Sequence, residues 1–184
     1  VHTVLVGRGG RVPIPVRERD EASGREHTRV KQVDVEVNPE LLSEIAAMTG
    51  EWKKIAMHHG ELTDAVCEKI DLPTIFVDDG CEAVDLETCD VGISQCDALV
   101  AQTGSVLVTS RSAGGRSLSV LPPHHIVLAK RDQLLPDLPA AFALLEERYA
   151  PDYPSFTSFI TGPSRTGDIE RILVLGAHGP KKLT

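Results

Sequence analysis

Aromatic residues and long hydrophobic runs are scarce in this sequence. Phe, Trp and Tyr make up 4% of the 184 residues, whereas hydrophobic residues of all kinds make up 41%. The core must therefore be built from Val, Leu, Ile and Ala, and a chain of this length can bury one full core. The longest apolar runs are far shorter than the roughly 20 residues that a membrane-spanning helix requires, so we expect no membrane association.

Basic residues are outnumbered by acidic ones. Lys and Arg number 19 and Asp and Glu number 27, which gives a formal net charge of −8. Nucleic-acid binding depends on concentrated positive charge that neutralises phosphates, so this balance argues against a nucleic-acid partner. It remains compatible with a small carboxylate ligand, because a few well-placed donors suffice for one carboxylate.

The four cysteines, Cys67, Cys81, Cys89 and Cys96, form no Cys-x-x-Cys pair. Zinc and iron–sulfur sites usually use such close pairs, so we predict free thiols, no metal site and no cofactor in this chain. No secretory signal pattern is seen near the N-terminus, and we expect a cytoplasmic location. The chain begins at Val1 rather than at Met, which leaves open whether the natural N-terminus is present.

Charges of both signs alternate from Arg17 to Lys31 with almost no apolar residue between them. This pattern is typical of a solvated segment. We therefore predict a mobile or partly ordered arm over residues 1–32, followed by a single α/β domain over residues 33–184.

Short hydrophobic strands alternate with amphipathic helices along the domain, which predicts a mixed sheet covered by helices. We expect an antiparallel meander between Cys89 and Ser110. Helices are predicted from Asn38 to Gly50, over Glu61–Ile70 and over Asp137–Tyr149. The remaining strands are predicted at Lys54–His58, Pro73–Val77, His125–Ala129, Phe156–Ile160 and Ile172–Leu175.

Two pairs of adjacent histidines occur in this pattern. His124 and His125 lie on a predicted strand, where neighbouring side chains face opposite ways, so we expect one to be packed and the other exposed. His58 and His59 have no carboxylate at metal-ligand spacing in the sequence, and we expect them at the surface.

Three segments combine glycine with hydroxyl-bearing residues at predicted strand ends: Ala101–Ser105, Thr161–Glu170 and Gly176–Pro180. Such turns can direct backbone amides and side-chain oxygens at a small anion. We expect the three to converge on one pocket at the mouth of the sheet. The candidate ligand-binding residues are Gln102, Thr103, Gly104, Gly162, Ser164, Thr166 and Gly179.

The candidate catalytic residues are His178, Asp168 and Glu170. Histidine titrates near neutrality and suits proton transfer, although His178 could equally brace its loop through a backbone carbonyl. Asp168 and Glu170 stand two residues apart, so that in an extended segment both carboxylates point to one side. They can act as acid and base or bind a cation, or they can form ion pairs with Arg165 or Arg171, and these alternatives stay open.

The same turns carry a resemblance to a known family. In order along the chain, the matching motifs are Val91–Ser94, Ala101–Gly104, Leu121–His125, Gly162–Glu170 and Gly176–Pro180. Over about residues 88–184 the sequence resembles the lactate-utilisation (LUD) domain family.

The resemblance implies a fold related to ribose-phosphate isomerases, glucosamine-phosphate deaminases and coenzyme A transferases. It also implies an accessory role beside iron–sulfur subunits that oxidise L-lactate to pyruvate. The clusters would lie in those partners, and this chain would bind a small carboxylate or a partner subunit.

The alternative is a stand-alone enzyme on this fold that acts on a sugar phosphate or an acyl-coenzyme A. At the Ala101–Gly104 turn the family usually has a glutamate, where this chain has Gln102. An amide has no carboxylate with which to form an acyl intermediate. This departure disfavours the transferase chemistry.

Overall fold

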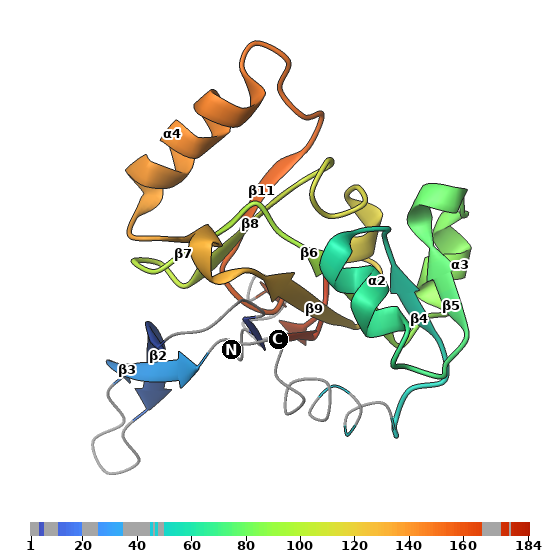
Figure 1. Ribbon diagram of the computed structural model, residues 1–184. Coiled ribbons are helices and arrows are strands. Elements are labelled where there is room, and N and C mark those ends of the chain that lie inside the picture. Colours follow the sequence, from blue (N-terminus) through green and yellow to red (C-terminus); the bar gives the residue numbers. More distant parts are fainter. Residues whose placement is uncertain are drawn as a thin grey trace.

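The computed structural model describes residues 4–5, 11–19, 26–34, 45, 47, 50–166, 174–176 and 178–184. These residues form an α/β structure with mixed parallel and antiparallel strands, and the predicted fold class is confirmed (Figure 1). No helix in this described part of the chain has the length and apolar character needed to cross a bilayer.

A six-stranded sheet lies at the centre, and every strand pair in it is parallel. Parallel strands are usually covered on both faces and therefore carry continuous apolar runs, as the buried strands β4, β6 and β9 do here. The strand order is β1 (Val4–Leu5), β9 (His124–Ala129), β6 (Val91–Gln95), β4 (Ile55–Met57) and β5 (Thr74–Phe76), and β14 (Lys182–Leu183) also pairs with β9.

Alternation along β4 divides its side chains between two helical layers. Ile55 and Met57 pack with Leu62 of helix α2 (Glu61–Cys67). Ala56 faces the other way and packs with Leu86 of helix α3 (Ala83–Glu87). Because successive side chains of a strand point to opposite faces, three apolar residues in a row serve both layers.

A four-stranded sheet packs against the first. Its order is β10 (Leu134–Leu135), β7 (Ala98–Val100), β8 (Ser105–Thr109) and β11 (Thr157–Ile160). Leu107 of β8 packs with Leu145 of helix α4 (Leu138–Tyr149), whereas Val106 and Val108 pack with Val127 of β9. Strand β8 is thus enclosed between α4 and the parallel sheet, as Figure 1 shows.

Most of the predicted elements are confirmed within a few residues, but the predicted meander is partly wrong. Strands β7, β8 and β11 pair antiparallel, whereas β6 pairs in parallel with β4 and β9. The chain passes from one sheet to the other at Cys96-Asp97. The buried Asp97 carboxylate accepts hydrogen bonds there from Arg148 Nη1 (2.8 Å) and Tyr149 Oη (2.5 Å), which ties α4 to the crossing point.

Short elements complete the described chain. Within the predicted arm, β2 (Arg11–Arg19) pairs antiparallel with β3 (Glu26–Asp34). Of the helix predicted after Asn38, Ile45 and Ala47 are described and helical. The other short elements are 3-10 turns at Val77–Asp79, Ser117–Ser119 and Arg131–Gln133, and an antiparallel pair of β12 (Arg165–Thr166) with β13 (Val174–Leu175).

The prediction that one residue of the His124-His125 pair is exposed is wrong, because β9 is covered on both faces. His124 is 7% exposed and His125 is fully buried. His124 Nε2 lies 2.8 Å from Thr184 Oγ1, and His125 Nε2 lies 2.8 Å from Ser94 Oγ. Burial lowers the pKa of His124 to about 4 and that of His125 to about 3.

These pKa values predict a loss of stability in mild acid. Below the ordinary histidine pKa of 6.5 the unfolded chain binds protons that folded His124 and His125 do not. The free energy of unfolding should therefore fall by up to about 2 kcal/mol per histidine between pH 6.5 and 5. Urea denaturation at both pH values, for the parent chain and for His124→Gln and His125→Gln, measures this. Each variant should show a smaller fall, and a parent stability that is constant with pH would contradict the account.

Candidate functional site

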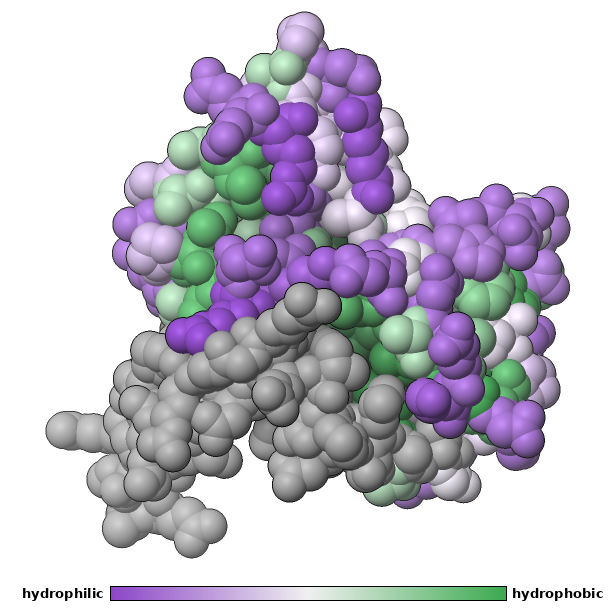
Figure 2. Space-filling view, in the orientation of Figure 1, coloured by the Kyte–Doolittle hydropathy of each residue, from purple (hydrophilic) through white to green (hydrophobic). Residues whose placement is uncertain are grey.

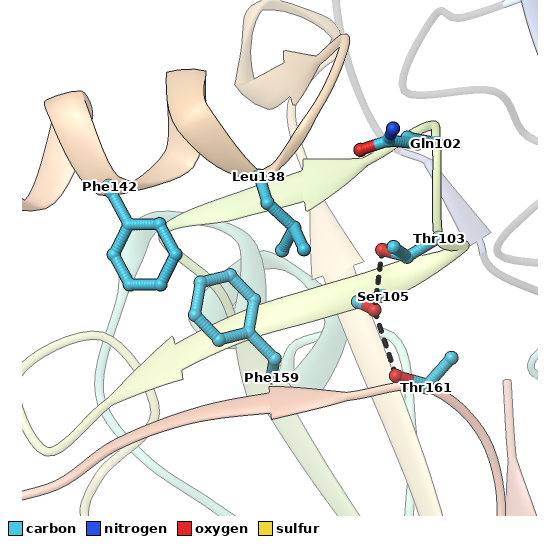
Figure 3. A pocket seen from close by; sticks show the side chains of 7 residues that line it. All are labelled: Gln102, Thr103, Ser105, Leu138, Phe142, Phe159 and Thr161. Carbon is cyan, nitrogen blue, oxygen red and sulfur yellow. Dashed lines mark hydrogen bonds between the residues drawn. The ribbon is translucent and has the colours of Figure 1, made fainter.

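The first cleft lies between α4 and the antiparallel sheet and has a volume of about 430 Å³ (Figure 3). The turn that joins β7 to β8 and the end of β11 contribute to its lining. One side is apolar and the other carries amide and hydroxyl groups. The lining residues are Gln102, Thr103, Ser105, Leu138, Phe142, Phe159 and Thr161.

Three hydroxyl groups form a continuous chain along the polar side of this cleft. Ser105 Oγ lies 2.7 Å from Thr103 Oγ1 and 2.8 Å from Thr161 Oγ1. Ser105 is buried at the start of β8, whereas Thr161 is exposed just beyond β11. The pairing of β8 with β11 brings the two residues together although they are 56 positions apart in the sequence.

Two phenylalanines form the apolar side. Phe142 of α4 and Phe159 of β11 have ring centroids 5.5 Å apart and planes inclined at 56°, an arrangement favoured by aromatic pairs. Leu138 points from the start of α4 toward the same space (Figure 3). Although the remaining members of this helical face, Leu145 and Tyr149, are buried, Phe142 is 58% exposed.

A second cleft of about 260 Å³ lies beside the turn that follows β13. His178 and Lys181 contribute its polar groups, while Val120, Leu121 and Pro123 contribute an apolar wall. The side chains of both His178 and Lys181 are exposed. The lining is completed by Gly176 and Gly179.

Ser164 fastens this turn through three hydrogen bonds. Its backbone N–H donates to the Pro180 carbonyl (2.9 Å), and its carbonyl accepts from the Gly176 N–H (2.9 Å). Its Oγ accepts from the His178 N–H at 3.3 Å. Gly176 has φ +75°, and a Cβ there would lie 2.4 Å from Lys181 Cγ. The turn thus needs glycine at this position both for its backbone conformation and for the path of the lysine.

The structure divides the three predicted turns between two clefts that share no lining residue. Gln102 and Thr103 line the first cleft, and Gly104 (φ +65°) forms the turn beside them. His178 and Gly179 line the second, next to Ser164.

Four further predicted site residues either do not line one of the two clefts or lie outside the residues that the structure describes. Gly162 (φ +148°) follows Thr161, and Thr166 pairs with Val174 between β12 and β13. Asp168 and Glu170 lie outside the described residues, so their predicted acid and base roles stay predictions.

The sequence analysis did not predict a polar contact at the topological switch point of the parallel sheet, where the strand order reverses. The connection from β4 leads to β5 on one side, whereas the connection from β6 leads to β9 on the other. Ligands of open α/β sheets bind outside the carboxyl ends of strands at such points. Here His58 Nε2 accepts a hydrogen bond from the Gln95 N–H (2.9 Å), and the Gln95 Oε1 accepts one from the Leu62 N–H (3.1 Å).

The surface location expected for His58 is therefore wrong, since it is 4% exposed. Its Nδ1–H donates to the His59 carbonyl at 2.9 Å, whereas its Nε2 is an acceptor. Only the neutral imidazole has one donor and one acceptor nitrogen, so these two hydrogen bonds require neutral His58. Burial lowers the pKa of His58 accordingly. His59 is half-exposed and stacks on Phe76 at 4.1 Å, and its hydrogen bond to Asp64 raises its pKa. The sequence signal was the position of His58 directly after an apolar strand.

Substitutions at the neighbouring glycines Gly114 and Gly115 can distinguish the cost of backbone strain from the cost of a steric clash with His58. Gly114 (φ +63°) and Gly115 (φ +96°) both have left-handed backbones, but a Cβ on Gly114 would lie 2.5 Å from His58 Cβ, whereas one on Gly115 would meet no atom within 4 Å. Gly115→Ala should cost about 1–2 kcal/mol from strain alone, and Gly114→Ala should cost more. Chemical denaturation of both variants measures the difference, and equal losses would contradict the packing of the Gly114 loop on His58.

The described cysteines do not assemble a metal site. Cys67, Cys81, Cys89 and Cys96 are all free, and burial raises the pKa of Cys96 to about 12. Among the described residues, no three His, Cys, Asp or Glu side chains are grouped so that they could hold a metal ion. The expectation that this chain holds no metal and no cofactor stays a prediction.

Comparison with known proteins settles the family. A family model described as the LUD domain matches residues 43–184. This chain belongs to the LUD domain family. The resemblance over residues 88–184 is thus confirmed and extends back across β4, α2 and β5, which carried no recognisable motif.

Named relatives agree with this assignment. A Lactate utilization protein C of Geobacillus sp. (strain WCH70) is 38% identical over 100 residues, which are 53% of this chain and 42% of that protein. The protein of the same name from Macrococcus caseolyticus (strain JCSC5402) is 30% identical over 166 residues, or 86% of this chain and 71% of that protein. The match to the Geobacillus relative therefore spans less than half of that protein's length.

A solved structure has the same fold. The crystal structure of a DUF162 family protein from Deinococcus radiodurans superposes with a TM-score of 0.60 at 19% sequence identity. The match covers 78% of this chain and 79% of that one. At this identity the likeness establishes the arrangement of the elements alone.

Proposed function

We propose that this chain serves lactate utilisation as an accessory subunit that holds no cluster of its own. It would act beside iron–sulfur subunits that oxidise L-lactate to pyruvate and would bind a small carboxylate. The observation that carries the proposal is the alignment to Lactate utilization protein C over 166 residues, which is 86% of this chain. The free, unclustered cysteines agree with redox centres that lie in partner subunits.

The second cleft is where we propose that the carboxylate binds. Lys181 offers a positive charge, and the His178 ring offers a hydrogen-bonding group beside it. Charge-assisted hydrogen bonds of this kind are the strong ones for a carboxylate. Lactate and pyruvate also carry a methyl group, for which Val120, Leu121 and Pro123 supply an apolar wall.

The rival hypothesis, a stand-alone enzyme for a sugar phosphate or an acyl-coenzyme A, draws less support. Gln102 presents an amide at the turn where an acyl-forming enzyme needs a carboxylate. Within the described part of the chain, neither cleft is lined by Asp or Glu. Turnover of either substrate class by the purified chain alone would revive this alternative.

Removal of the lysine charge tests the proposed carboxylate site. Lys181→Gln should weaken binding of L-lactate and pyruvate about tenfold, because a charged hydrogen bond contributes about 1.5–3 kcal/mol. Isothermal titration calorimetry measures the two dissociation constants. Lys182→Gln is the matched control, since Lys182 is exposed and belongs to β14. Equal binding by the parent and by Lys181→Gln would remove this cleft from the proposal.

Reconstitution tests the accessory role separately. The purified chain should associate with candidate iron–sulfur partner proteins and should raise their rate of lactate oxidation. Size-exclusion chromatography and an electron-acceptor assay, each with and without this chain, measure the two effects. No association together with an unchanged rate would contradict the accessory role, whatever the result at Lys181.

A further inference from the structure

We propose that the first cleft is a second ligand site, one that takes an uncharged flat ring with a carbonyl group on its edge, as in the naphthoquinones. This site differs in chemistry from the carboxylate site proposed at His178 and Lys181. The two are lined by different residues, so either can be lost while the other remains.

The cleft contains an aromatic pair with one exposed member. Phe142 leaves 58% of its surface in solvent, although Phe159 stands 5.5 Å away and Leu138 lines the same space. Figure 2 shows hydrophobic surface on this part of the molecule, along α4 and the strands beside it. A flat ring placed against the tilted pair would cover this surface and gain aromatic contacts.

The three hydroxyl groups on the polar side leave one proton without an acceptor in the described part of the chain. Thr103, Ser105 and Thr161 carry three hydroxyl protons, and the two hydrogen bonds among them use two. Whichever way these bonds run, one O–H is left over, and no further partner is found for it among the described residues. A carbonyl oxygen at the edge of a bound ring would accept that proton.

Charge and size define the ligand class. The described lining residues include no Asp, Glu, Lys or Arg, so a phosphate or carboxylate would enter without a counter-charge, which is costly. The volume of about 430 Å³ is within the range of small-molecule pockets, about 300–1,000 Å³. An uncharged bicyclic ring fits these limits, whereas a nucleotide does not.

Binding of 2,3-dimethyl-1,4-naphthoquinone to the full chain, followed by ligand-observed NMR, tests the proposal. This probe has no free ring position that reacts with thiols. Phe142→Ala should weaken binding about tenfold through the loss of ring contacts and buried area. Tyr153→Ala is the matched control, because Tyr153 is also exposed (55%) but does not line the cleft.

A comparison of ligands tests the hydroxyl chain. The quinone should bind about fivefold more tightly than 2,3-dimethylnaphthalene, which lacks the carbonyls. The double variant Thr103→Val/Thr161→Val should abolish that preference while it retains hydrocarbon binding. Absence of quinone binding up to its solubility limit, or equal binding by the parent and Phe142→Ala, would overturn the proposal. Carboxylate binding in the same samples reports independently on the Lys181 site.

Discussion

The fold depends on the burial of β9 on both of its faces. Ile126 and Leu128 belong to the core under α2, whereas Val127 and Ala129 belong to the core beneath β8. One strand therefore joins the parallel sheet to the antiparallel one. The two histidines on this strand must be neutral, because a buried charge without a partner is costly, and each of them is hydrogen-bonded through Nε2.

The packing of the two sheets on either side of β9 also determines where the two clefts form. The second sheet needs a helix over its outer face, and α4 supplies it through Leu145 and Tyr149. The contact of Asp97 with Tyr149 fixes the end of that helix at the crossing between the sheets. The first cleft opens at the other end of α4, next to Leu138. The second forms where the C-terminal segment returns to β9.

The sequence predicted local features well because local chemistry determines them. Asp137 caps α4 through the Ala140 N–H, and the apolar period of that helix is explicit in the sequence. The parallel pairing of β6 and the burial of His58 and His124 depend instead on strands distant in the chain. The expectation of one shared pocket was wrong for the same reason. The order of motifs along the chain does not determine which edge of which sheet each turn lies at. The glycine and hydroxyl residues were found, but their division between two clefts was not predictable.

The proposed site places a small carboxylate against Lys181, beside the turn that Ser164 holds by hydrogen bonds. A crystal structure of the chain soaked with pyruvate tests it most directly. The account predicts electron density for a carboxylate within hydrogen-bonding distance of Lys181 Nζ, with the methyl group toward Val120 and Leu121. Pyruvate bound at a different place, or an unoccupied cleft in crystals of a chain that binds pyruvate in solution, would contradict it.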